Sequence, residues 1–364
     1  ALVGRLAVNR SYTAQEAMLG SPALRKQIQA LIAWLRPTIE VYDTLRLGQH
    51  APVPQRARRR VLYLDDLFSL RYEKMLNFAK ENPVSIDPLG EFASNVPSPL
   101  RALVRRPAIY RPVLRMERDR IERREIELVN KFDASLLVNQ HEVDILRARS
   151  GSTTVRQING LLPSLGTPVR RRVNPPELLF LGRLNIPHND DGICAFLRLA
   201  MPELVVRLPD VMVRLIGKGA SENLCSLARR YPDNVRIEGF VEDLGPLFAR
   251  ATASLAPLRF GTGIKIKTLD SLARGLPVLA TSGGVDGIPI GPAGADGCVV
   301  SDNLSEWPRL IEQLIKPERN AQLSKAGRAF FNRTYASDVV MAQYDTIFGL
   351  TRQADPVGAL RAFG

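Results

Sequence analysis

Residues 261–281, GTGIKIKTLDSLARGLPVLAT, decide how this chain is interpreted. They begin with a glycine-rich turn, continue with a pattern typical of a helix over residues 265–274, and end with a Gly-x-Pro turn and the apolar run 278–280. A glycine-rich turn that leads into a helix exposes backbone N–H groups where the helix dipole favours an anion. The stretch therefore predicts a phosphate-binding loop, a helix and a buried strand.

Segments typical of strands and helices alternate regularly from about residue 175 onward. This alternation favours an α/β fold with a parallel sheet that helices cover on both faces. In such a sheet, ligands bind outside the carboxyl ends of the strands. The expected strands are 178–181, 211–216, 235–237, 253–256, 278–280 and 298–300, and the expected helices are 192–207, 221–230, 243–250, 265–274 and 305–315.

The loops after the expected strands share glycines and positive charges. Arg183, Arg259 and Lys267 lie in these loops and could bring their charges to one point. Glycine and cation together at several strand ends predict a site for a diphosphate. The loops are residues 182–192, 217–219, 257–267 and 281–287.

The stretch from Gly261 to Thr281 resembles the donor-site signature of family-4 glycosyltransferases. In that family a Gly-rich loop, a helix that carries an acid, and Gly-x-Pro-Val follow one another. Residues 180–183 and 187–192 resemble the opening of the same domain, especially in the bacterial branch that builds exopolysaccharide and cell-envelope glycans. The resemblance covers about residues 175–335, and it extends more faintly over residues 21–160.

The resemblance implies the GT-B fold, in which two Rossmann-like domains face a cleft. It also implies an enzyme that transfers a hexose from a nucleotide-diphosphate sugar to a glycan or lipid-linked acceptor, with retention and without a metal or other cofactor. Arg183 and Lys267 would neutralise the leaving diphosphate as catalytic residues, and Asp270 would bind the ribose hydroxyls. The other expected donor-binding residues are Gly182, Gly217, Phe240, Gly261, Thr262, Gly263, Gly283 and Gly284.

Three positions depart from the family pattern. Asn189 stands where a second basic residue is usual, and Asp270 stands where the helix acid is usually Glu. Thr262 replaces the Glu that touches the transferred sugar. Relatives with Gly-Thr-Gly share the last change, so we interpret it as a feature of one branch, and the identity of the sugar and the stereochemical outcome stay open.

The first half fits a partial acceptor-side domain. Comparison with the family leads us to expect either an initial strand–helix–strand portion ahead of Ala1 or an opening unlike the family's. We expect an acceptor-side domain over 1–166, a linker over 167–176, a donor domain over 177–335, and a C-terminal helix and tail over 336–364 that cross back to the first domain. Within the first half, the expected strands are 39–42, 61–64, 134–138 and 155–158, the expected helices are 21–36 and 113–130, and 82–112 is expected to be loop and short helix.

Five further residues are candidates for the cleft, each beside a structural alternative. Asp65 and Asp66 follow an expected strand and form either a catalytic or acceptor-contacting pair or a simple turn. His141 lies near the cleft or has a helix-capping or surface role, and we favour the capping or surface role. His188 and Asn189 lie in the loop expected to face the donor.

The net charge of +13 indicates an anionic partner. Arginines in 56–60 and 101–111, the latter without an acid between them, predict reversible contact with anionic lipid, whereas 115–127 mixes both signs as a solvated helix does. We expect a cytoplasmic protein that can lie peripherally at the inner face of the plasma membrane. Three scattered cysteines and three histidines offer little for a metal site.

Two alternatives to a transferase use the same residues differently. A nucleotide-sugar epimerase on the same scaffold would need more ionisable groups at the strand ends than this chain shows. A basic binding module without catalysis is the other, but the chain has no nucleic-acid fold signature and only 6% aromatic residues, so we expect no nucleic-acid partner. A dinucleotide-binding Gly-x-Gly-x-x-Gly fingerprint is also lacking.

Overall fold

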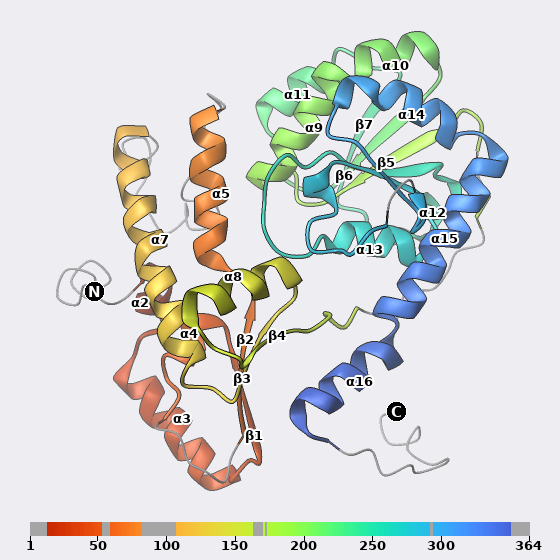
Figure 1. The fold of residues 1–364 in the computed structure, drawn as a ribbon. Coiled ribbons are helices and arrows are strands. Elements are labelled where there is room, and N and C mark those ends of the chain that lie inside the picture. Colours follow the sequence, from red (N-terminus) through yellow and green to blue (C-terminus); the bar gives the residue numbers. More distant parts are fainter. Residues whose placement is uncertain are drawn as a thin grey trace, which may run out of the picture.

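The computed structural model describes residues 13–52, 59–81, 107–162, 170–171, 173–291 and 294–350. They form two α/β lobes, each built on a parallel sheet, and the expected fold class is confirmed (Figure 1). The expected linker 167–176 lies partly outside the described residues, so its limits stay a prediction.

The first lobe contains a four-stranded sheet in the order β1-β2-β3-β4, with every neighbouring pair parallel. The strands begin and end within two residues of the expected ones, and helices cover the sheet (Figure 1). The strands are β1 (Ile39–Asp43), β2 (Arg59–Asp65), β3 (Ala134–Leu137) and β4 (Val155–Gln157), and the helices are α2 (Ala14–Leu19), α3 (Pro22–Leu35), α4 (Thr44–Gly48), α5 (Phe68–Glu81), α7 (Pro107–Val129) and α8 (Gln140–Ser150).

Helices α5 and α7 differ from the sequence expectations. Helix α5 was not expected, and α7 begins six residues earlier than expected, with Pro112 inside it. Proline removes a helix hydrogen bond, but Tyr110 and Leu114 on either side of it are buried against Leu76 of α5. Packing between the two helices therefore outweighs the local cost of the proline. The rest of the expected loop, residues 82–106, lies outside the described residues.

The second lobe contains a six-stranded parallel sheet in the order β10-β9-β8-β5-β6-β7. The chain runs outward from β5 to β7 and then returns to β8 on the other side of β5, which makes the gap between β5 and β8 the switch point where α/β sheets bind ligands. The strands are β5 (Glu177–Leu181), β6 (Met212–Ile216), β7 (Val235–Gly239), β8 (Ala253–Ala256), β9 (Val278–Ala280) and β10 (Cys298–Val300), and the helices are α9 (Pro187–Leu199), α10 (Met201–Arg207), α11 (Glu222–Ala228), α12 (Gly245–Arg250), α13 (Ile266–Ala273), α14 (Trp307–Leu314) and α15 (Pro317–Tyr335).

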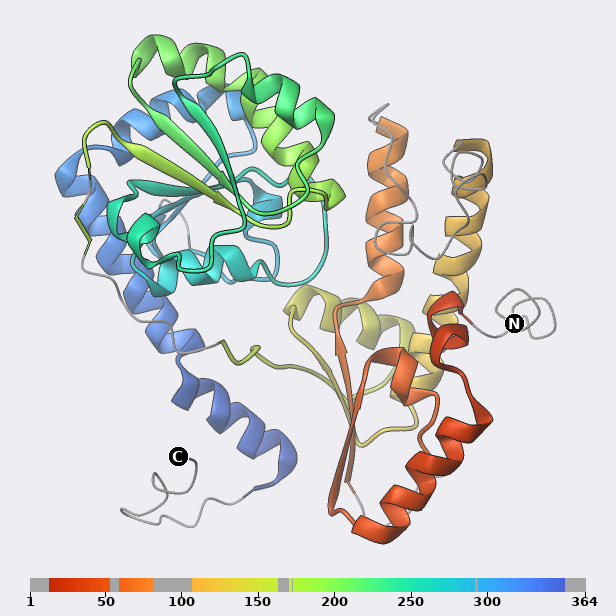
Figure 2. The ribbon, with the colours of Figure 1, turned by 180° about the vertical axis from the view of Figure 1, so that it is seen from behind.

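Helices α15 and α16 (Ser337–Phe348) carry the chain from the second lobe back to the first (Figure 2). Ile347 is buried in a cluster with Val61 of β2 and Leu136 of β3, and Tyr344 and Phe348 pack against that cluster. The end of the described chain thereby fixes one lobe beside the other.

Candidate functional site

The ends of β5 and β6 approach each other more closely than any side chain would allow. Gly217 has a φ of +150°, and a Cβ added there would lie 1.8 Å from the carbonyl oxygen of Gly182. Gly182 has a φ of +146°, and a Cβ there would lie 3.0 Å from the Nζ atom of Lys267. The glycines expected at the donor site therefore let the loop after β5 lie directly against the start of α13.

Lys267 lies at the switch point with little water around it. Its Nζ atom donates to Oδ1 of Asn189 and lies 4.5 Å from the centre of the Phe180 ring. The Nδ2 atom of Asn189 donates to the backbone oxygen of Arg183 at 2.8 Å. Burial, with a smaller contribution from Lys265, lowers the pKa of Lys267 to about 7.

Asn189 thus replaces the family's second cation with a neutral side chain that holds Lys267 in place. The Lys267 amine is brought beside the Gly182-Arg183 turn, as the expected diphosphate site requires. An anion bound there would favour the charged form of the amine and raise its pKa again.

The Lys265 side chain forms hydrogen bonds to the backbone of the loop formed by Gly261, Thr262 and Gly263. The Lys265 side chain is 6% exposed, and its Nζ atom donates to the backbone oxygens of Thr262 at 3.0 Å and Gly263 at 2.7 Å. Burial lowers its pKa to about 8. Lys265 is therefore not a solvated lysine, because a tight glycine turn leaves carbonyl groups that need a donor, and its amine supplies one.

His188 lies against this loop, and a Cβ added at Gly261 would be 3.7 Å from its ring. Burial, followed by the charges of Lys267 and Lys265, lowers the pKa of His188 to about 3. The imidazole is therefore neutral near pH 7, and it can donate or accept a hydrogen bond without adding charge.

The residues expected to contact the nucleoside lie at two places. Asp270 accepts a hydrogen bond from Nε of Arg274 at 2.8 Å, and the Arg274 guanidinium lies 4.6 Å from the Phe248 ring centre. Phe240, directly after β7, is 67% exposed, with the Lys218 amine 4.6 Å from its ring centre. An exposed ring at a strand end can stack on a base.

Three expected site residues have structural roles instead. The Arg259 guanidinium forms a bidentate pair with Asp191, at 2.8 and 2.5 Å, so its charge is already neutralised. A Cβ at Gly283 would lie 2.2 Å from the carbonyl oxygen of Leu258, and one at Gly284 would lie 2.2 Å from that of Ala256. Close packing of the two loops explains these glycines.

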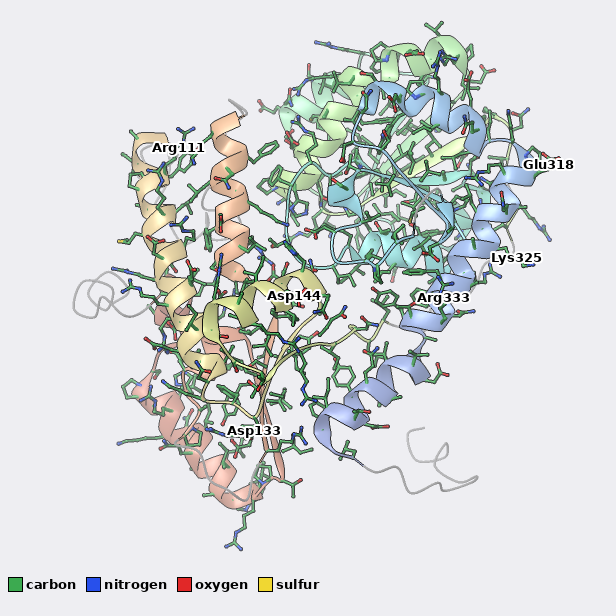
Figure 3. The ribbon with its side chains drawn as sticks, in the orientation of Figure 1. Arg111, Asp133, Asp144, Glu318, Lys325 and Arg333 are labelled. Atoms are coloured by element: carbon green, nitrogen blue, oxygen red, sulfur yellow. The ribbon has the colours of Figure 1, made fainter. Side chains whose placement is uncertain are left out.

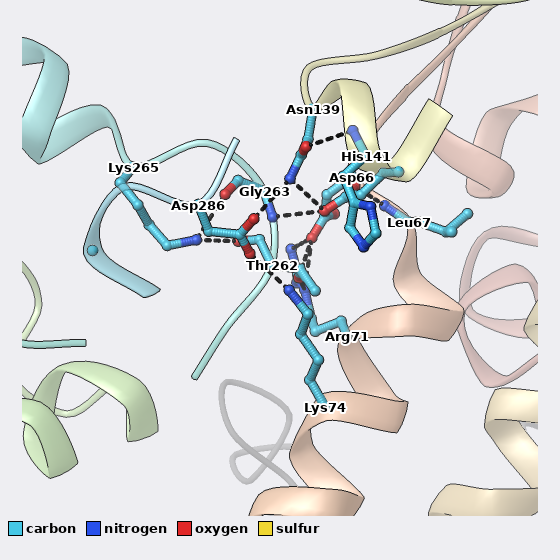
Figure 4. A network of polar contacts seen from close by, with 12 residues as sticks. Asp66, Leu67, Arg71, Lys74, Asn139, His141, Thr262, Gly263, Lys265 and Asp286 are labelled. Carbon is cyan, nitrogen blue, oxygen red and sulfur yellow. Dashed lines mark hydrogen bonds and ion pairs between the residues drawn. The ribbon is translucent and has the colours of Figure 1, made fainter. Parts of the chain in front are cut away.

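Across the gap between the lobes, Thr262 contacts Asp66 (Figure 4). The Thr262 hydroxyl donates to Oδ2 of Asp66 at 2.7 Å, and Nε of Arg71 donates to the same oxygen at 2.9 Å. Asp66 is 2% exposed. The expected pair of acids is thereby split: Asp66 lies in the site, whereas Asp65 is exposed at the end of β2 with a left-handed φ of +67° that suits a turn.

Sequence analysis missed Glu142, which also joins the lobes. Its carboxylate accepts the backbone N–H of Gly263 at 3.0 Å and that of Leu67 at 2.7 Å. Burial raises the pKa of Glu142. An acid in the first turn of the helix after a buried strand was the only available signal, and it normally indicates no more than a favourable helix dipole.

Asp286 makes two further contacts in the network of Figure 4. Asp286, in the loop after β9, accepts from Lys74 at 2.7 Å and from Asn139 at 3.2 Å. Asn139 also accepts the backbone N–H of His141 at 3.0 Å and so caps α8, while the His141 side chain is exposed. Asn139 is therefore the helix cap, and of the roles favoured for His141 the surface role agrees with its exposed side chain.

Within the ranges that the structure describes, no three His, Cys, Asp or Glu side chains gather as metal ligands would. No described helix combines the length and the apolar composition that crossing a membrane requires.

Comparison with known proteins identifies the second lobe. A model of the family described as glycosyl transferases group 1 matches residues 175–317. Residues 175–317 are therefore similar to that family. The matched segment spans β5 to the start of α15, and so it contains the switch point, the Gly-rich loop and Lys267.

Curated relatives extend the similarity over more of this glycosyltransferase-like chain. Phosphatidyl-myo-inositol mannosyltransferase of Mycobacterium tuberculosis is 25% identical over 240 residues, which cover 61% of each chain. A GDP-mannose-dependent mannosyltransferase of Corynebacterium glutamicum that acts on a monoacylated phosphatidylinositol monomannoside is 31% identical over 154 residues, 39% of each chain. The chain thus spans less than two thirds of the length of these relatives.

Solved structures share the arrangement of both lobes. Sucrose-phosphate synthase from Thermosynechococcus elongatus superposes with a TM-score of 0.61 at 15% identity, over 90% of this chain and 77% of that one. Anabaena HepE in complex with UDP and glucose gives a TM-score of 0.61 at 13% identity, over 90% and 82%. The chain therefore has the GT-B fold.

Proposed function

We propose that this protein transfers a sugar from a nucleotide-diphosphate sugar to an envelope or exopolysaccharide acceptor, with retention at the anomeric carbon and without a metal. The observation that carries the proposal is the position of Lys267. Its amine lies beside the Gly182-Arg183 turn, in a loop-to-helix segment that matches group 1 glycosyl transferases.

The chemistry of this arrangement suits a departing diphosphate. Negative charge grows on the diphosphate as the glycosidic bond breaks, and a cation already positioned in a dry site stabilises that charge without reorganisation. Lys267 supplies the cation, while Phe240 offers a stacking surface for the base. The relatives include a GDP-mannose-dependent enzyme, and HepE was solved with UDP and glucose, so both bases are candidates for the donor.

The experiment that tests the proposal is a binding screen by thermal shift with UDP-, GDP- and dTDP-sugars. A ligand at about 100 times its dissociation constant stabilises the folded state by roughly 2.7 kcal/mol. We expect one base to raise the melting temperature clearly more than the others. If the folded protein shifts with none of them, the donor site is not where we place it. The anomeric configuration of the product, read by NMR, then tests retention.

We further propose reversible contact with an anionic membrane surface, because the acceptor of an envelope enzyme is often lipid-linked. The arginine cluster at 56–60 supports this less than expected: Arg60 is buried and donates to the backbone oxygens of Pro52 and Lys131. Arg56, Arg58 and residues 101–106 lie outside the described residues, while Arg111 lies near the far end of α7 (Figure 3).

Helix α3 gives the stronger support for membrane contact. None of its residues is buried, it contains no acid, and Trp34 is 77% exposed close to Leu31 and Leu35, which are also exposed. Helices with exposed apolar residues and basic neighbours lie in membrane interfaces. We expect sedimentation with anionic vesicles that weakens with salt and falls when Trp34 and Leu31 are replaced by Ser. Equal binding to neutral vesicles would contradict the electrostatic part, and equal binding of the variant would exclude α3.

A further inference from the structure

Two buried carboxylates of the first lobe reach the Gly-rich loop of the second, and they differ in how their oxygens are used. Glu142 is fully buried and Asp66 is 2% exposed. Both contact residues 262–263 within hydrogen-bond distance (Figure 4). This difference distinguishes a residue that only holds the lobes together, which we call the clamp, from a residue whose carboxylate can still accept a hydrogen bond from a ligand.

Glu142 is the clamp. One of its oxygens accepts the N–H of Gly263 and the other accepts the N–H of Leu67, so each oxygen has a backbone donor. Both donors are fixed parts of the chain, one in each lobe. Glu142 therefore holds the lobes together.

Only one of the two carboxylate oxygens of Asp66 accepts hydrogen bonds from described residues. Its Oδ2 atom accepts from Thr262 and Arg71, whereas its Oδ1 atom is buried and accepts no hydrogen bond from any described residue. A buried carboxylate oxygen without a donor is costly, and native structures seldom retain one without a function. Arg71, which shares Oδ2 with Thr262, is 44% exposed whereas Asp66 is 2% exposed, so a small molecule would reach the carboxylate by displacing one of these two side chains.

The position of the contact indicates which molecule approaches. The resemblance noted from the sequence implies an acid at the position of Thr262 that would touch the transferred sugar, and in this structure the Thr262 hydroxyl is bound to a carboxylate, 2.7 Å away. We propose, on the basis of the function proposed above, that Asp66 replaces that acid from across the cleft. A hydroxyl of the transferred sugar would donate to Asp66 beside Thr262, which makes Asp66 a residue that determines donor-sugar specificity.

The proposal has a consequence that an acid on the loop itself would not have. The diphosphate is bound by the second lobe alone, whereas the sugar needs Asp66 from the first lobe. A nucleoside diphosphate and the corresponding nucleotide-sugar should therefore respond differently when Asp66 is changed.

The experiment measures, by calorimetry, the affinities of wild type and Asp66→Asn for GDP, UDP, GDP-mannose and UDP-glucose. Loss of a hydrogen bond to a charged acceptor corresponds to about tenfold to a hundredfold in affinity. We expect that loss for the nucleotide-sugar that binds wild type, and less than about a twofold change for its nucleoside diphosphate. Asp144→Asn, an exposed acid on α8, is the matched control and should leave both affinities unchanged (Figure 3).

A rescue separates sugar binding from lobe packing. Thr262→Glu in an Asp66→Asn background puts the acid back on the loop, and it should restore affinity for the nucleotide-sugar. If Asp66→Asn weakens both ligands equally or neither, the inference is overturned while the proposed function stands. If wild type binds none of the four ligands, the proposed function itself fails. Should Asp66→Asn unfold, Asp66→Glu keeps the charge but moves it, and it should still alter binding of the nucleotide-sugar alone.

Discussion

The two lobes have sheets of the same type, but they place opposite chemistry at the carboxyl ends of their strands. The second lobe presents glycines, the buried Lys265 and the partly buried Lys267. The first lobe presents the buried acids Asp66 and Glu142. A single fold thus supplies one surface that favours an anion and one that accepts hydrogen bonds.

Under the proposed function, this difference would let the two lobes divide the substrate. The anion-binding lobe would hold the part of the donor that leaves, where charge grows during the reaction. The buried acids of the first lobe would accept hydrogen bonds from neutral hydroxyl groups. The network of Thr262, Gly263 and Asp286 with the first lobe puts the two surfaces in contact.

The largest expected effect tests the anion-binding lobe through Lys267→Ala. Removing one positioned electrostatic group typically lowers turnover by about 10²–10³, or about 2.7–4 kcal/mol. Steady-state kinetics with the donor found in the screen measures this effect. Lys325→Ala, an exposed lysine of α15, is the control and should keep normal turnover (Figure 3). Normal turnover of Lys267→Ala would remove Lys267 from the reaction.

A smaller effect is expected for Asp270→Asn, because ribose is bound alike in the ground and transition states. The loss of a bond to a charged acceptor, about 1.5–3 kcal/mol, should raise KM with kcat nearly kept. The structure adds a check, since Asp270 also pairs with Arg274 four residues on. The two side chains are only 12% and 19% exposed, so removing the Asp270 charge should also lower the melting temperature. An inactive variant that binds donor normally would place Asp270 beside the sugar instead.

The glycines of the second lobe should matter for folding more than for binding. Gly217→Ala puts a Cβ 1.8 Å from a backbone oxygen at a φ that side chains rarely adopt, so we expect a loss of roughly 1–3 kcal/mol in unfolding free energy. Gly160→Ala in the first lobe meets nothing within 4 Å and should stay within about 0.5 kcal/mol of wild type. Urea denaturation compares them. Equal stabilities would show that the ends of β5 and β6 can move apart.

The sequence predicted the second lobe better than the first for a physical reason. Its strands are short, mostly apolar runs next to turn residues: Pro257 follows 253–256, and Gly275 and Pro277 precede 278–280, so both strands are found with the expected limits. Such signals are local. Helix α5 and the early start of α7 depend instead on packing against each other. The contacting residues, Leu76 in α5 and Tyr110 and Leu114 in α7, lie 30 or more positions apart in the sequence.

The candidate site shows the same limit at the level of single residues. The positions of Lys267 and Gly261 follow from one continuous motif. The partners of Arg259 and Asp66 do not, since Asp191 and Thr262 lie 68 and 196 positions away along the chain. Sequence predicts which loops gather at the switch point, but pairing between residues far apart in the sequence decides which charges remain available.

The smallest expected effect concerns pH and again separates the lobes. The folded-state pKa of Lys267, about 7, lies below the ordinary lysine value of about 10.4. Between these two pH values the unfolded chain binds more protons than the folded protein. The unfolding free energy therefore rises as the pH increases from about 7 to about 10.4, and it falls as the pH decreases over the same range. Lys265, with a pKa of about 8, contributes in the same direction.

Lys267→Met removes one of these two groups and should flatten the rise in unfolding free energy between pH 7 and pH 10, measured by urea denaturation without donor. Lys325→Met, exposed on α15, should retain the wild-type slope. Nucleoside diphosphate should reverse the effect, because its charge raises the pKa of Lys267. Binding at pH 8 should therefore take up protons in wild type and fewer in Lys267→Met, which calorimetry in two buffers of different ionisation enthalpy detects. Equal proton uptake by both proteins would mean that the diphosphate does not reach Lys267, and the anion-binding surface would then lie elsewhere on the second lobe.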